Sequence, residues 1–155
     1  MISRRQNGFA IGELVIALVV LGLLAALILN SLQIEQAKMR DAARRNDIDN
    51  IAAGLEACYG DKCHSTYPSL LQLTDTFANG FVYTNLAGLR SDSLYDSSAG
   101  IIQSNATSAA TQYQYVSTPP NCTGTVGSAP CTGYTLRAYQ ETNPEYSYAK
   151  ESLHK

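Results

Sequence analysis

The chain has 155 residues, of which 45% are hydrophobic and 15% charged, and its formal net charge is −2. This length suits one domain of ordinary size. The hydrophobic residues are concentrated near the N-terminus, since 18 of the 21 residues from 9 to 29 are apolar. The basic residues after position 45 are scattered, so the chain lacks the clustered positive charge of a dedicated duplex-DNA-binding protein. This distribution also argues against a wholly cytosolic enzyme.

Residues 9–29 are long enough to cross a membrane as a helix. At 1.5 Å per residue the segment would extend ~31 Å, which matches the hydrocarbon core of a bilayer. Arg4 and Arg5 precede it, and the positive-inside rule therefore predicts that the N-terminus stays in the cytoplasm. A cleaved secretory signal is less suitable, because no small-x-small cleavage pattern follows the apolar residues. A plain membrane anchor fits the length but leaves Glu13 unexplained.

Glu13 is the only ionisable side chain in this apolar segment. An ionised carboxylate costs about 2.5–3.5 kcal/mol near the centre of a bilayer and less towards its surface. An acidic residue in such a segment is therefore a candidate functional residue whose partner must be identified.

Gly8, Phe9 and Glu13, followed by the apolar run, resemble the class III leader of type IV pilins and type II secretion pseudopilins. In that family a membrane-embedded prepilin peptidase cuts after the glycine and methylates the new N-terminus. The resemblance implies cleavage between Gly8 and Phe9, N-methylation of Phe9, and a role for Glu13 in assembly. The new α-ammonium group, with an ordinary pKa of about 7.7–8.0, and Glu13 of a neighbouring subunit would neutralise each other in an apolar filament core.

The resemblance also implies an α+β pilin fold, in which a long N-terminal helix packs on a small, three-stranded antiparallel sheet. The expected divisions are a leader at 1–8, a transmembrane and filament-core helix at 9–29, an amphipathic continuation at 30–59, and a globular head with a cysteine-closed loop at 60–155. Many pilins have a proline near the end of the apolar run, but residues 29–31 contain none, so the steric cause of a kink is absent.

Such a chain would be a structural subunit and not an enzyme, and no cofactor is expected. Its partners would be other copies of itself or mixed pilins, the prepilin peptidase, the membrane and, indirectly, an assembly platform with its motor ATPase. It would wait in the inner membrane and then join a cell-surface pilus that serves adhesion, twitching motility or DNA uptake. DNA binding is possible but is not indicated by the charge. The alternatives are a type II secretion pseudopilin and a single-pass membrane-anchored enzyme or binding domain.

The helix should continue beyond the membrane, because residues 23–53 contain neither proline nor glycine. Its second half is amphipathic and should bury one stripe against the head. The expected apolar stripe consists of Ile34, Ala37, Ile48, Ile51, Ala52, Leu55 and Tyr59, and the expected polar side of Asn46, Asp47, Asn50, Gly54 and Glu56.

The basic residues Arg40, Arg44 and Arg45 of this helix are interpreted as a solvated face, with subunit or lipid-head contact as the alternative. Arg45 lies four residues from both Asp41 and Asp49. Pairs at this spacing face each other on a helix, so we expect intrahelical ion pairs there.

The four cysteines form two close pairs in the sequence, Cys58 with Cys63 and Cys122 with Cys131. They suit an oxidising, exported compartment, and we favour a disulfide within each pair, although four cysteines allow three connectivities. Cys58 and Cys63 can meet only if the helix ends near them, and Gly60 would permit the reversal. A four-cysteine zinc site is the weaker alternative, because eight residues separate Cys122 from Cys131, more than in a zinc knuckle.

Local patterns predict the elements of the head. Ser69 and Gln72, just after Pro68, form a capping-box pattern that predicts a short helix to about Ala78. The Ser- and Thr-rich residues 91–110 are expected to be mostly exposed loop. Alternating residues then predict three strands, joined as an antiparallel meander, at 112–118, 133–140 and 146–150.

The remaining chemistry-bearing residues form no strong motif. His64 and His154 are isolated in the sequence, and no GxSxG, HExxH, Walker A or GxGxxG pattern occurs. Asp92 and Asp96 are candidates for a calcium site such as some major pseudopilins carry. They lack EF-hand spacing, which favours a solvated acidic loop instead, and no metal site is expected.

Overall fold

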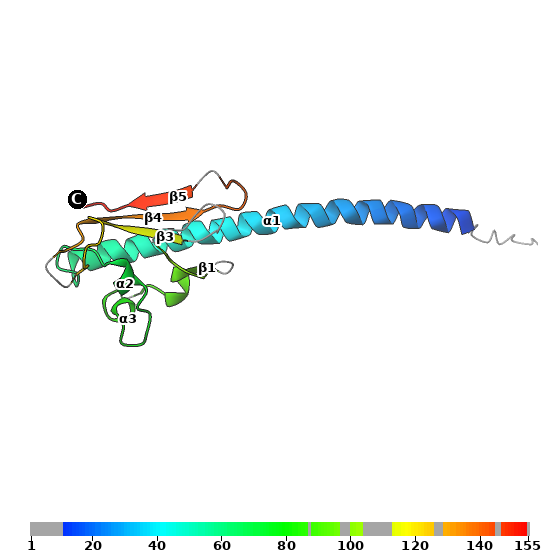
Figure 1. Cartoon of the computed structure of the whole chain (residues 1–155). Coiled ribbons are helices and arrows are strands. Elements are labelled where there is room, and N and C mark those ends of the chain that lie inside the picture. The colour runs from blue at the N-terminus through cyan, green and yellow to red at the C-terminus, as the bar shows by residue number, and fades with distance from the viewer. Residues whose placement is uncertain are drawn as a thin grey trace, which may run out of the picture. The chain divides into compact units, whose positions relative to one another are not determined.

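The computed structural model has an α+β architecture, with one long N-terminal helix and small antiparallel sheets (Figure 1). The chain divides into two compact units, Met1–Ala37 and Lys38–Lys155, of which the second is called the head below. The structure describes residues 11–86, 88–96, 100–103, 113–125, 129–144 and 147–154.

Helix α1 extends over Ile11–Gly60 and contributes to both units. It contains no proline, and its end at Gly60 lies close to the predicted one. The chain reverses just beyond it, where His64 and Ser65 adopt left-handed conformations with φ of 52° and 59°. The left-handed residues of this turn are therefore His64 and Ser65, and not Gly60 as predicted.

Three strands form the main sheet of the head in the order β3-β4-β5. They are β3 (Tyr113–Thr118), β4 (Gly133–Tyr139) and β5 (Ser147–Glu151), and both pairings are antiparallel. The register places Tyr115 opposite Leu136 and Ala138 opposite Tyr148. The predicted meander is therefore present, while residues 112 and 146, predicted as strand starts, lie outside the described residues.

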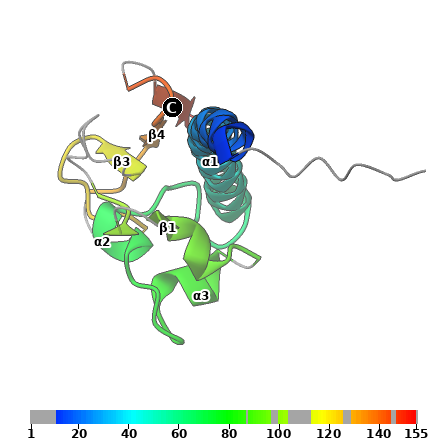
Figure 2. The same cartoon turned by 90° about the vertical axis from the view of Figure 1, so that its right-hand side faces the viewer.

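The core of the head lies between the second half of α1 and one face of this sheet (Figures 1 and 2). Of the predicted apolar stripe, Ile48, Ile51 and Leu55 are fully buried, whereas Ile34 is 56% exposed. The strands contribute alternate residues, as a sheet with one buried face requires. The buried residues from the sheet are Tyr113, Tyr115, Tyr134, Leu136 and Ala138.

Short elements connect α1 to the sheet. They are α2 (Leu70–Leu73), α3 (Phe81–Asn85), the 3₁₀ helix η1 (Ser91–Leu94), and the paired strands β1 (Tyr95–Asp96) and β2 (Gly100–Ile101). Figure 2 shows α2, α3 and β1 approaching α1 from a different side than the sheet.

Two predictions for this connecting region need correction. The capping box between Ser69 and Gln72 is present, but the helix that it starts ends at Leu73, well before Ala78. The described part of residues 91–110 is not mostly exposed loop, because Leu94 and Ile102 are fully buried. The remainder of that predicted loop lies outside the described residues.

Two disulfides close short loops in the head. Cys58 is joined to Cys63 with Cα atoms 5.0 Å apart, and Cys122 to Cys131 with Cα atoms 5.1 Å apart. All four cysteines are buried. With every cysteine in a disulfide, none is left to form the alternative zinc site.

Candidate functional site

Residues 11–28 of α1 form the candidate membrane and assembly segment. Every large apolar side chain in it is between 48% and 83% exposed. The helix is long and apolar enough to cross a membrane, with a mean hydropathy of 2.8 in its most apolar window. Apolar side chains exposed at this density need a nonaqueous environment, either lipid or other protein.

Glu13 lies in the first turn of α1 and is exposed. The positive end of the helix dipole favours a carboxylate in this turn. No other side chain between residues 11 and 28 is ionisable. Gly8 and Phe9 lie outside the described residues, so the cleavage and methylation that the sequence predicts there stay predictions.

The head contains a second arrangement of charged residues, centred on Arg44 of α1. Its guanidinium donates to Asp96 Oδ2 at 2.5 Å, to Glu141 Oε1 at 2.6 Å and to Asp41 Oδ1 at 3.0 Å. The Arg44 side chain is only 2% exposed. One buried arginine therefore joins α1 to β1 and to the connection between β4 and β5.

Asp41 and Arg40 extend this network along α1. Asp41 accepts hydrogen bonds from the backbone N–H groups of Glu141 and Thr142, at 2.8 and 3.0 Å, and from the Thr142 hydroxyl at 2.7 Å. Arg40 binds Glu141 with two nitrogens, the shorter contact being 2.7 Å. We define the Arg44 cluster as Arg40, Asp41, Arg44, Asp96 and Glu141.

Hydrogen bonding shifts the pKa values of Asp41, Arg44 and Glu141 in the Arg44 cluster. Burial would raise the pKa of Asp41, but hydrogen bonds from Thr142, from the Glu141 backbone and from Arg44 hold this pKa below its ordinary value. The hydrogen bond from Arg40 is the main cause that lowers the pKa of Glu141. Burial would lower the pKa of Arg44, yet hydrogen bonds to Asp96 and Glu141 raise it. These three groups are therefore firmly charged at neutral pH.

The Arg44 cluster corrects the prediction for the basic residues of α1. Arg44 is buried, and Arg40 is held in an ion pair although its side chain is 42% exposed, so neither lies on a simple solvated face. Asp41 pairs with Arg44 and not with Arg45. Arg45 is exposed, and its guanidinium carbon lies 5.9 Å from the centre of the Tyr148 ring. Sequence spacing alone could not show these long-range contacts.

Asp92 and Asp96, the candidate calcium ligands, have different partners. Asp96 is buried against Arg44, whereas Asp92 forms an exposed ion pair with Arg90 at 2.7 Å. An ion pair with arginine occupies the oxygens that a cation would need. Within the part of the chain that the structure describes, no group of three or more His, Cys, Asp or Glu side chains could hold a metal ion.

Asp47 and Glu56, on the predicted polar side of α1, also contact the head, whereas Asn46 and Asn50 of that side are exposed. Asp47 accepts a hydrogen bond from the Tyr113 hydroxyl at 2.7 Å. Glu56 accepts hydrogen bonds from the hydroxyls of Tyr67 at 2.8 Å and Tyr134 at 3.0 Å. Burial, together with these carboxylates, raises the pKa of all three tyrosines, which therefore stay neutral donors.

The C-terminal residues also lie against α1. Lys150 of β5 forms an ion pair with Asp49 at 3.1 Å. The spacing in the sequence had predicted that Asp49 pairs with Arg45. His154 stacks on Tyr59, with ring centres 4.3 Å apart. His64, in contrast, is exposed in the turn after α1. The two histidines, which are isolated in the sequence, therefore lie in different environments.

Comparison with known proteins gives no family model, curated protein or solved structure that matches this chain. The likeness to type IV pilins therefore depends on the N-terminal residues themselves. The apolar helix, the α+β head and the two disulfides are coarser features that many exported proteins could have.

Proposed function

We propose that this chain is the precursor of a type IV pilin-like subunit, which is cleaved between Gly8 and Phe9 and assembles into a filament through α1. The observation that supports this most is the exposed apolar segment 11–28 with a single carboxylate in its first turn. A lipid bilayer would cover this surface before assembly. The same segments of neighbouring subunits would cover it in a filament.

Glu13 favours a filament over a plain anchor. A carboxylate in an apolar core is stable only if an opposite charge lies beside it. Within the segment 9–29 no basic side chain is available, so the partner must come from elsewhere. The α-ammonium group created at Phe9 by cleavage is such a charge, and it would be supplied by the next subunit. This pairing would set the axial register between subunits.

The proposal assigns the head to the outer side of the membrane. The arginines at positions 4 and 5 would remain cytoplasmic by the positive-inside rule. The two disulfides of the head suit the oxidising environment that an exported domain meets. The proposed partners are a prepilin peptidase, an assembly platform with its motor ATPase, the membrane, and further copies of the chain.

Substitutions at Glu13 test the assembly role. Glu13→Leu and Glu13→Gln both remove the charge, and loss of a buried pairing partner costs about 3–5 kcal/mol, so we expect filament yield from sheared cells to fall strongly. Glu13→Asp keeps a carboxylate and is the matched control, with a yield closer to wild type. All three variants should still reach the membrane and be cleaved.

Two outcomes would contradict this assembly account. A normal filament yield for Glu13→Leu would show that the carboxylate is not needed. An absence of filaments in wild-type cells, with the chain retained in the membrane, would favour a single-pass anchor.

A further inference from the structure

The connection between β3 and β4, called the disulfide loop below because the Cys122–Cys131 disulfide closes it, carries an acceptor pattern for N-linked glycosylation. Asn121, Cys122 and Thr123 match Asn-x-Ser/Thr, in which x is any residue except proline. A second match begins at Asn105, which lies outside the described residues. So short a pattern also occurs by chance, and its structural surroundings therefore decide whether it can be modified.

Asn121 lies at the tip of a tight turn. The Cys122 N–H donates to the Pro119 carbonyl at 3.3 Å, and Asn121 has a left-handed conformation with a φ of 64°. Proline at the second position and a left-handed asparagine at the third are typical of a type II turn. Asn121 and Thr123 are exposed, whereas Cys122 between them is buried. The two residues that define the acceptor pattern are thus both at the surface.

The side-chain amide of Asn121 has no task in the fold. Within the part of the chain that the structure describes, no hydrogen bond, ion pair or ring contact includes it. Thr123, in contrast, donates to the Ala129 carbonyl with its hydroxyl at 3.0 Å and with its N–H at 2.7 Å. A group attached to Asn121 would therefore break no contact of the folded head.

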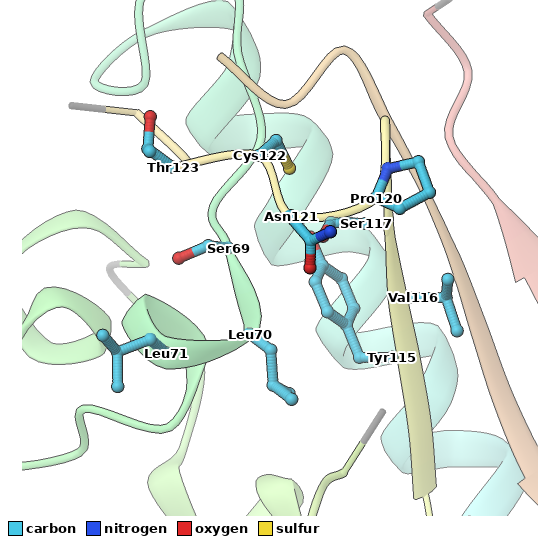
Figure 3. Close-up of a pocket in the computed structure, with 10 residues that line it drawn as sticks. All are labelled: Ser69, Leu70, Leu71, Tyr115, Val116, Ser117, Pro120, Asn121, Cys122 and Thr123. Atoms are coloured by element: carbon cyan, nitrogen blue, oxygen red, sulfur yellow. The ribbon is translucent and has the colours of Figure 1, made fainter. Parts of the chain in front are cut away.

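A groove of about 620 Å³ begins at Asn121. Figure 3 shows the Asn121 side chain directed into this groove, which lies between β3 and the start of α2. Leu71, which is 81% exposed, and the hydroxyl-bearing Ser69 and Ser117 line it, and none of the described lining residues is charged. A sugar ring has apolar C–H faces as well as hydroxyl groups, so this lining suits a neutral saccharide.

We propose that Asn121 is an N-linked glycosylation site and that the first sugars of its glycan lie along this groove. The donor would be an oligosaccharide linked to a lipid pyrophosphate. The Asn121 amide nitrogen loses a proton and forms a bond to C1 of the first sugar, while the bond from C1 to the pyrophosphate oxygen breaks. Because residue 119 is proline and not an acidic residue, the transferase would recognise the three-residue pattern alone.

The proposal depends on export of the head, which the proposed function includes, but not on cleavage after Gly8 or on a filament. The transferase needs access to the Thr123 hydroxyl, which is engaged in the folded disulfide loop. Transfer would therefore precede closure of the loop by the Cys122–Cys131 disulfide. Once attached, the glycan would give the exposed Leu71 side chain a neutral, hydrophilic cover.

Peptide mapping by mass spectrometry, with the full chain purified from the cells that produce it, tests the modification. We expect the peptide that contains residue 121 to carry an oligosaccharide on that residue. Thr123→Ala should reduce the modified fraction at least about tenfold, whereas Thr123→Ser, the matched control, keeps the hydroxyl and should remain modified. Asn121→Gln should abolish the modification and leave the head folded, since the amide holds no contact there.

Hydroxyl-radical footprinting of the full chain in micelles tests the placement of the sugars. Leu71 should be labelled at least about twofold more in Asn121→Gln than in the glycosylated wild type. Phe77 is the control, because it is also 81% exposed but does not line the groove, and its labelling should not change. Equal labelling of Leu71 in the two proteins would overturn the placement.

Three results would overturn the modification itself. They are an unmodified Asn121 in the wild-type chain, an oligosaccharide at residue 105 only, and an unchanged modified fraction in Thr123→Ala. The same spectra report the mature N-terminus. A chain that begins at Phe9 with an unmodified Asn121 would therefore overturn this proposal and leave the proposed function intact.

Discussion

At the scale of single residues, Arg44 has the largest structural consequence in the head. Its guanidinium satisfies carboxylates from three separate parts of the sequence, including Asp96, 52 residues away, and Glu141, 97 residues away. Burying a charge is favourable only when its partners are in place. The main role of the Arg44 cluster is therefore to position β1 and the β4–β5 connection on α1. Its net contribution to the free energy of folding is smaller.

Replacing Arg44 by methionine keeps most of the side-chain volume but leaves the carboxylates without their cation. We expect Arg44→Met to lower the free energy of unfolding by about 3–5 kcal/mol, measured by denaturant titration of the full chain in micelles. Arg90→Met is the matched control, because Arg90 forms an exposed pair with Asp92 and surface pairs contribute little. Equal stability of the two variants would mean that the Arg44 cluster does not hold the head together.

The same cluster predicts how the stability of the head depends on pH. The pKa values of Asp41 and Glu141 are lowered from ordinary values of 3.8 and 4.5, so the unfolded chain binds protons before the folded one does. Their contribution is therefore complete at neutral pH and is lost as the pH falls from about 4.5 through the folded-state values. Denaturation midpoints measured between pH 7 and pH 3 should decrease in this range.

Substitution of Asp41 identifies the source of that decrease. Asp41→Asn should be less stable at pH 7 and should show a smaller further loss on acidification, because one titrating carboxylate is gone. Asn46→Ala, which changes an exposed side chain of α1 that does not titrate, should keep the wild-type dependence. An unchanged acid transition in Asp41→Asn would contradict the assignment.

At the scale of elements, the contact between α2 and the disulfide loop depends on one glycine. Gly124 has a φ of +84°, and a Cβ atom there would overlap the Gln72 side-chain oxygen. That oxygen accepts from the N–H groups of Ser69 and Thr125, at 3.0 and 3.1 Å. Gln72 therefore caps its own helix and holds the loop with the same atom, which leaves no space for a larger residue at Gly124.

Gly124→Ala should displace Gln72 as well as strain the backbone. Gly88 provides the control, since its φ is +94° but no atom lies within 4 Å of the position that a Cβ would occupy. Gly88→Ala should cost the strain alone, about 1–2 kcal/mol. We expect Gly124→Ala to lose a further ~1–3 kcal/mol because hydrogen bonds to Gln72 are broken. Thermal unfolding of both variants measures the difference, and equal losses would refute the double role of Gln72.

Elements with local patterns could be predicted from the sequence. The three strands follow from period-2 alternation among neighbouring residues, and Tyr134, Leu136 and Ala138 are buried as the pattern predicted. The capping box at Ser69 was likewise visible because its two residues lie three positions apart. The end of that helix at Leu73 was not predicted, because residues 74–79 contain no glycine or proline to mark it.

Features that depend on distant partners could not be predicted. Asp47 and Glu56 look like solvated residues on the polar side of α1, and only the fold brings tyrosines against them. Arg44 looked the same for this reason. Leu94 and Ile102 lie in short apolar pairs, Leu94 with Tyr95 and Ile101 with Ile102, in a polar stretch with no period that would mark them as core.

At the scale of the whole molecule, the two units need different surroundings. The first has exposed apolar side chains throughout residues 11–28, whereas the head has its own core and two disulfides. Lipid would cover the apolar segment while the chain is in a membrane, and neighbouring subunits would cover it in a filament. Under the proposed function, Glu13 is the residue for which these two environments would differ most, because only a filament would supply a neighbouring α-ammonium group.

The identity of the mature N-terminus tests this account most directly, because every later step depends on cleavage after Gly8. Mass spectrometry of the chain purified from the cells that produce it should find Phe9, N-methylated, as the first residue. Gly8→Val should leave the leader attached, whereas Gly22→Val, at a glycine with open space around it, should be processed normally. A wild-type mature chain that begins at Met1, or after Leu29, would contradict the pilin-like account.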